Sequence, residues 1–231
     1  ALSMDGLNGI YGSGFTMTAG WGVFLDAQGS ALQLDNFTMD GYNVTMQGGS
    51  VSLQSGHIHT FGGGFSATAN TGGIDLYSTW IDDSGSGDIR LDASGSMNGI
   101  TAQWMYLDTG VGGDIIFDAS DSAPGISISN AEFGAAGTTH AIMLYANNSA
   151  SGIAIDNSTI SAGASMVIEA NDGGGISIYA STVAATGDYL HIYATGGTGG
   201  VVLNNSTFTN PAGGITVDAS GSDGGIHIYG A

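Results

Sequence analysis

Two aspartates that occupy the same place in a recurring segment are the residues best suited to bind a cation. Asp92 and Asp118 stand in the segments IRLDA and IIFDA, each directly before an alanine. If these segments form neighbouring strands, the two side chains lie about 4.8 Å apart. Hard cations such as Ca²⁺ take carboxylate oxygens as ligands. The pair is therefore a candidate calcium site. The alternative, which we favour, is a solvated acidic face that keeps the protein in solution.

Three tyrosines are candidates for contact with a glycan or a protein partner. Tyr145, Tyr179 and Tyr193 fall at alternate positions of short apolar segments, where a strand would point them outward. Exposed tyrosine rings beside aspartate and asparagine can stack on sugar rings. The alternative is that these tyrosines only support a β surface, for which they have a high propensity.

The remaining polar residues predict no catalytic centre. His57 and His59 could share one face of a strand, but the sequence shows no third metal ligand beside them. Asp82 and Asp83 are adjacent, whereas glycoside hydrolysis needs two carboxylates that flank the substrate. A polysaccharide lyase needs a basic residue, and Arg90 is the only one in the chain. We therefore expect no enzymatic activity and no cofactor, calcium excepted.

Several Asn-X-Ser/Thr triplets provide candidate glycosylation sites. Asn36, Asn157 and Asn205 are the best placed, because each follows an apolar segment at a predicted turn. Chance is the alternative that we favour, since the whole chain is rich in Asn, Ser and Thr.

An internal repeat sets the positions of all these residues. An alternating apolar segment that ends in Ala, or once in Gly, begins at positions 23, 44, 65, 89, 115, 142, 166, 190 and 215. Successive starts are 21 to 27 residues apart. A second segment follows each one, as in GISI, GIAI and GIHI, and a third apolar position follows the second segment. Each repeat therefore predicts three strands separated by turns.

The repeat predicts an all-β fold, a right-handed parallel β-helix of nine to ten coils with three strands per coil. One repeat has too little apolar surface to offset its ordering entropy, so the coils must stack. Frequent Gly disfavours helix, and a propeller blade needs about 40 residues. We expect one domain over residues 1–231, with an irregular first coil or cap over 1–22 and regular repeats over 23–229.

Composition excludes two classes of partner. The formal net charge is −19, with one basic residue against 20 acidic ones. Neutralising phosphates requires Lys or Arg, so the chain is not expected to bind nucleic acid. No apolar run approaches the roughly 18 residues of a membrane span, so no membrane insertion is expected.

Three stretches resemble the repeats of filamentous-haemagglutinin-type exoproteins. They are GGDIIFDASDSAPGISISNAEF, GIAIDNSTISAGASMVIEA and GGITVDASGSDGGIHIYG, and the resemblance covers roughly residues 20 to 229. The family consists of bacterial surface or secreted adhesins with right-handed β-helical shafts. The resemblance implies an extracellular or cell-surface location. The family's secretion domain carries Asn-Pro-rich motifs, whereas this chain has only one Asn-Pro pair, Asn210-Pro211. The resemblance therefore implies that the chain corresponds to the shaft of such a protein and not to its secretion domain.

The two ends of the sequence suggest self-association. The strand GGIHIYGA near the carboxy terminus would leave an open edge, to which Ile226 and Ile228 contribute. The amino-terminal segment is apolar enough to pair with it, through Leu2, Met4, Leu7 and Ile10. A contact between unlike ends propagates as a fibre. The alternative is that the chain is an excerpt of a longer shaft.

Together these features predict a non-catalytic structural rod or filament subunit for adhesion, biofilm matrix or surface display. The alternative is a β-helix that binds carbohydrate, with surface glycans as partners, or one that cleaves polysaccharide.

Overall fold

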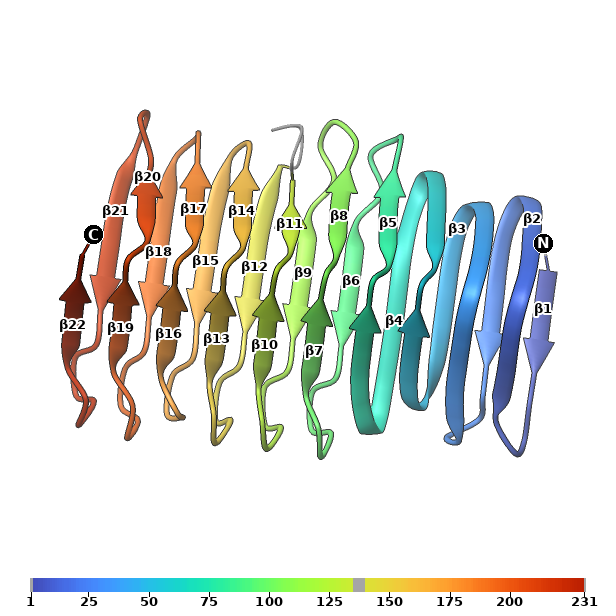
Figure 1. Cartoon of the computed structure of the whole chain (residues 1–231), viewed down its shortest axis with the longest axis horizontal. Coiled ribbons are helices and arrows are strands. Elements are labelled where there is room, and N and C mark those ends of the chain that lie inside the picture. The colour runs from blue at the N-terminus through green and yellow to red at the C-terminus, as the bar shows by residue number, and fades with distance from the viewer. Residues whose placement is uncertain (1, 135–139, 231) are drawn as a thin grey trace.

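The chain is a parallel β-solenoid, as the repeat predicts. A computed structural model describes residues 2–134 and 140–230, so that Ala1, Ala231 and residues 135–139 of the predicted domain lie outside the described residues. Every regular element of the described residues is a strand, and the strands form a solenoid of about nine turns. The coils lie side by side along the long axis, with the termini at opposite ends (Figure 1).

Each coil contributes a strand to three faces that run along the rod. The first face contains β1 (Leu2–Asp5), β6 (Ile89–Asp92), β9 (Ile115–Asp118), β12 (Ala141–Tyr145), β15 (Ser165–Glu169), β18 (Tyr189–Tyr193) and β21 (Gly214–Asp218). The second contains β7 (Ile100–Gln103), β10 (Ile126–Ser129), β13 (Ile153–Asp156), β16 (Ile176–Tyr179), β19 (Val201–Asn204) and β22 (Ile226–Tyr229). The third contains β5 (Trp80–Asp83), β8 (Tyr106–Thr109), β11 (Glu132–Phe133), β14 (Thr159–Ala162), β17 (Thr182–Ala185) and β20 (Thr207–Thr209).

Three long strands near the amino terminus run through more than one face. They are β2 (Ile10–Asp26), β3 (Ala31–Gln54) and β4 (His57–Tyr77). The short period of these coils leaves no loop at several corners, and the chain turns there at register shifts such as the one between Ala19 and Gly22. The expectation of three separate short strands therefore holds from β5 onward and not in these first coils.

The amino-terminal residues, expected as an irregular first coil or cap, enter the same parallel register. Leu2–Asp5 pair with Val23–Asp26, and Ile10–Ser13 pair with Leu32–Asp35. Every strand pairing among the described residues is parallel, and equivalent residues of successive repeats face each other. The ladder on each face therefore follows the sequence repeat without a slip.

The core is one continuous apolar column. Inward residues of the first two faces, such as Ile115, Phe117, Leu144 and Ile178, are almost wholly buried. The third apolar position of the repeat lies inward as well, from Met39 through Val183. Strand alternation explains this pattern, because every second residue points into the coil. The predicted inward register is confirmed.

The corner between the second and third faces has one residue per coil in left-handed backbone. These eight residues have φ between 46° and 55°: Asn36, Ser55, Ser78, Trp104, Asn130, Asn157, Ala180 and Asn205. The next residue turns inward, and in three successive coils it is a buried serine: Ser158, Ser181 and Ser206. Each of the first two of these serines has a backbone N–H that donates to the hydroxyl of the serine one coil further along. This corner is therefore a polar column inside an otherwise apolar core.

Glycine directly precedes the strand of the second face in most coils for a steric reason. Gly125 and Gly152 have φ of 69° and 64°, and a Cβ at either position would collide with the carbonyl oxygen of the glycine one coil further on. Backbone therefore approaches backbone at this corner, which only glycine permits.

Candidate functional site

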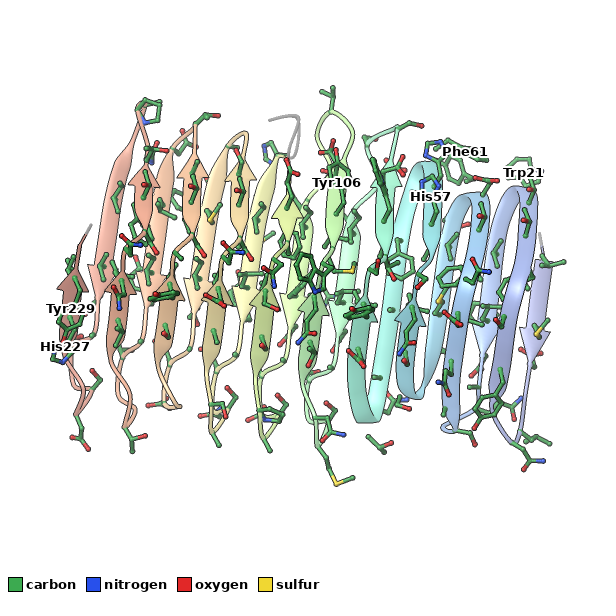
Figure 2. The ribbon with its side chains drawn as sticks, viewed as in Figure 1. Trp21, His57, Phe61, Tyr106, His227 and Tyr229 are labelled. Carbon is green, nitrogen blue, oxygen red and sulfur yellow. The ribbon has the colours of Figure 1, made fainter. Side chains whose placement is uncertain are left out.

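The densest group of chemically active side chains lies on the third face, over β4, β5 and β8. His57 pairs with Trp80, and Trp80 with Tyr106, as successive residues of one outward column. His59 pairs with Asp82, and Asp82 with Asp108, in a second column beside the first. His57 and Tyr106 lie on the same side of the rod (Figure 2).

Asp82 is held by the two histidines. His57 Nε2 lies 2.8 Å from Asp82 Oδ1, and His59 Nδ1 lies 2.5 Å from Asp82 Oδ2. The two histidines therefore share a strand face, as their spacing predicts, and the carboxylate bridges them. No group of three or more Cys, His, Asp or Glu within residues 2–134 and 140–230 is arranged to hold a metal ion.

Asp83 has a different role from its neighbour, because it points into the coil. It is 3% exposed and accepts hydrogen bonds from the Thr60 hydroxyl and from the backbone N–H groups of Gly62, Gly85 and Gly87. The carboxylate therefore fixes the corner between the third and first faces. Since Asp82 and Asp83 lie on opposite sides of the strand, they cannot flank one substrate.

The aromatic rings of the first column are in contact with one another. The ring centroids of Trp80 and Tyr106 are 4.3 Å apart, and those of His57 and Trp80 are 5.9 Å apart in an edge-to-face arrangement. The stack ends at the next coil, where Glu132 takes the place of a ring and Thr159 follows it. A hollow remains where the rings stop.

This hollow, which we call the corner groove, crosses from the third face to the left-handed corner. Its principal lining residues are Trp80, Trp104, Tyr106, Asn130, Glu132, Asn157 and Thr159. The aromatic rings form one part of the lining, and hydroxyl, amide and carboxylate groups form the rest. Asn157 Nδ2 donates to Asn130 Oδ1 over 2.6 Å, which fixes both amides at the rim.

The groove lies in a negative electrostatic environment. Partial burial raises the pKa of the Tyr106 hydroxyl, and the nearby carboxylates of Asp108, Glu132 and Asp82 raise it further. Each of these carboxylates disfavours the phenolate by like-charge repulsion.

Sequence reasoning overlooked the three aromatic residues of the groove. The sequence places two of them at an equivalent position of the repeat, because Trp80 and Tyr106 directly precede Ile81 and Leu107 of the third apolar column. Trp104 occupies the turn position that holds Asn130 in the next repeat. Neither position belongs to the two main strands of the repeat, where alternation identifies outward aromatic residues.

The calcium candidates are neighbours on the first face. Asp92 pairs with Asp118 across β6 and β9, as predicted. Arg90 Nη2 lies 3.5 Å from Asp92, and each carboxylate accepts a hydrogen bond from the backbone N–H two residues further along the chain. Two carboxylates supply few of the roughly six to eight oxygens that Ca²⁺ takes.

The three candidate tyrosines do not form one site. Tyr145 and Tyr193 share a column of the first face, where Glu169 lies between them. Tyr179 lies on the second face, beside Asp156 and Asn204. Partial burial and the Glu169 carboxylate raise the pKa of Tyr145. The strands that carry these residues face different directions, so contact of the three tyrosines with a glycan or a protein partner stays a prediction for two separate faces.

The candidate glycosylation residues share the left-handed corner. Asn36, Asn157 and Asn205 are all exposed and have positive φ. The side-chain amide of Asn157 is engaged with Asn130, and no side-chain hydrogen bond of Asn36 occurs among the described residues. The structure therefore explains these asparagines as turn residues, which tolerate left-handed backbone.

The residues predicted for end-to-end contact lie at the two ends of the rod. Leu2, Met4 and Leu7 are 40%, 42% and 77% exposed, and Ile226 and Ile228 are 46% and 58% exposed. Ile10 differs, since it is 5% exposed and packs within the core.

Comparison with protein-family models, with curated proteins and with solved structures found no match to this chain. No helix among residues 2–134 and 140–230 is long and apolar enough to cross a membrane.

Proposed function

We propose that the chain is a non-catalytic structural rod, a shaft segment of a secreted or cell-surface protein that serves adhesion, biofilm matrix or surface display. The observation that carries the proposal is the parallel pairing of coil on coil from β1 to β22, with one apolar core beneath it. Three hydrogen-bonded faces join most neighbouring coils, so an axial load is shared among them. A fold of this kind extends by adding coils and holds its surface residues at a fixed spacing.

The repeat resemblance supports the finer form of this proposal. Shafts of filamentous-haemagglutinin-type adhesins are long β-helices, and the first two units that carry the resemblance each span one strand of every face. We propose that this chain performs the same mechanical role, which requires an extracellular or cell-surface location. The net charge of −19 suits such a role, because like-charged rods do not aggregate side by side.

End-to-end contact is the mode of assembly that we propose. Continuing the register would set β21 of one molecule against β1 of the next, so that Ile215 stacks on Leu2 and Val217 on Met4. In the same contact β22 would face the start of β2, with Ile226 over Ile10. The apolar rows at the two ends match, and the exposure of Leu2, Met4, Ile215 and Ile226 supports such a contact, whereas Ile10 is already buried. On the third face no strand follows β20 among the described residues, so the junction would be closed on two faces only.

Two double variants test this contact. Ile226→Lys with Ile228→Lys places charge on the inward row of β22, whereas His227→Lys with Tyr229→Lys places the same charge on its outward row. We expect wild type and the outward variant to form fibres in negative-stain images, and the inward variant to stay monomeric. Circular dichroism checks that both variants remain folded. A wild type that sediments as a monomer at high concentration would contradict the assembly, and the rod would then act as part of a longer shaft.

Carbohydrate binding is a second candidate function, and the corner groove favours it. That candidate concerns the surface of a single rod and is independent of how rods assemble.

A further inference from the structure

A tryptophan in left-handed backbone is the feature of this surface that the fold does not explain. Trp104 has φ of 55° and is 59% exposed. Left-handed backbone is unfavourable for a bulky side chain, and residues kept in it against this cost cluster at functional sites. The equivalent corners of the other coils hold Asn, Ser or Ala. The turn therefore does not require tryptophan, and burial gains little from it.

The surroundings of Trp104 provide complementary groups for a ligand. Trp80 and Tyr106 present aromatic surface at the end of their stack. Glu132 and Thr159 are both exposed and line the same hollow. Hollows that combine aromatic surface with a few fixed polar groups are typical of ligand sites.

We propose that the corner groove binds the pyranose rings of a non-acidic glycan. The C–H-rich face of a pyranose ring packs on aromatic rings, which Trp104 and Tyr106 supply. Its hydroxyls donate to the Glu132 carboxylate and exchange hydrogen bonds with the amides of Asn130 and Asn157. The groove is open at the surface, so each ring contributes a modest contact and a chain of several sugars binds better than one.

Charge restricts the class of glycan. Asp82, Asp108 and Glu132 lie beside the ring stack, and they add to the effect of partial burial in raising the pKa of Tyr106. Arg90 is the only arginine or lysine in the chain, and it lies on the first face beside Asp92. An acidic sugar would therefore meet repulsion with no lysine or arginine at the groove to offset it. Neutral and amine-bearing glycans avoid this cost.

The experiment combines a glycan array with calorimetric titration. The array carries neutral, amine-bearing and acidic glycans, and the titration uses cellohexaose, hexaglucosamine and hexagalacturonate with the full chain. We expect binding on the array to be confined to non-acidic glycans. In titration we expect at least one of the first two hexasaccharides to bind at least tenfold more tightly than hexagalacturonate. Absence of binding to every non-acidic glycan on the array, or equal binding of acidic ones, would overturn the proposal.

A matched pair of variants separates binding from folding. Trp104→Asn removes the ring and places there the residue found at four other corners. Trp21→Asn removes a tryptophan that is more exposed, 78% against 59%, and that lies near the amino-terminal end of the rod (Figure 2). We expect Trp104→Asn to lose at least tenfold in affinity while its melting temperature stays equal or rises, and Trp21→Asn to bind as wild type. A lower melting temperature with unchanged affinity would assign Trp104 a structural role and overturn the proposal.

Discussion

At the scale of single residues, the contrast between adjacent side chains tests the register most directly. Leu144 is wholly buried and Tyr145, next to it on β12, points outward. Leu144→Ala should lower the free energy of unfolding by about 2–5 kcal/mol, because it removes contacts and leaves a cavity. Tyr145→Ala should cost much less. Denaturant melts of both variants provide the measurement, and equal costs would contradict the register.

Tyr106 provides a second test at this scale. Its pKa is raised, so the phenol ionises later in the folded protein than the usual value of about 10. The contribution of the neutral phenol to the free energy of unfolding is fully present below the usual pKa. It is lost as the pH rises through the raised pKa of the folded protein. In an ultraviolet titration, the difference between wild type and Tyr106→Phe should develop above pH 10.

The carboxylate contribution to that shift can be isolated. Glu132→Gln should bring the ionisation of Tyr106 closer to its usual range, because one of the repelling charges is gone. Glu169→Gln, which removes a carboxylate beside Tyr145 on the first face, is the control and should leave Tyr106 unchanged. An identical effect of the two variants would mean that only net charge matters.

At the scale of strands, β6 gives a prediction about proteolysis. It carries Arg90, the only site for trypsin, and pairs on both sides, with β4 and with β9. Protease needs an extended, unpaired segment, so cleavage requires local opening. We expect the native protein to resist trypsin and the unfolded chain to give two fragments on a gel. Rapid cleavage of native protein would show that β6 opens readily.

Strands also show how far sequence reasoning extends. The inward columns were predictable, because burial forces residues such as Ile115 and Leu144 to be apolar in every repeat. The conformations of the corners were less predictable from the sequence. The joined strands β2, β3 and β4 depend on corners that turn without loops, and alternation alone does not report this. Trp104 escaped prediction because its backbone conformation is set by the coil geometry, whereas its side chain follows no pattern of the repeat.

At the scale of the whole molecule, the solenoid should lose structure from its ends. Each coil is stabilised by its neighbours, and the end strands β1 and β22 have one neighbour among the described residues. Inward residues there, such as Ile226 and Ile228, remain exposed. We expect hydrogen exchange to be slowest in central strands such as β9 and β12 and fastest in β1 and β22. Uniform protection along a monomeric rod would contradict this gradient.

Because equivalent residues of successive coils pair, the length of the molecule can change only in steps of one whole coil. Equivalent residues of successive coils face each other, so the surface left by removing one coil matches the surface of the next. Excising residues 166–189 would bring β12 against β18, with Ile142 opposite Leu190. The rod would then shorten by one step of about 4.8 Å, and the two coils beside the cut would pair with each other in the same register. The same unit could be inserted instead of removed. The distance between two surface residues of this protein could therefore be set by the number of coils between them.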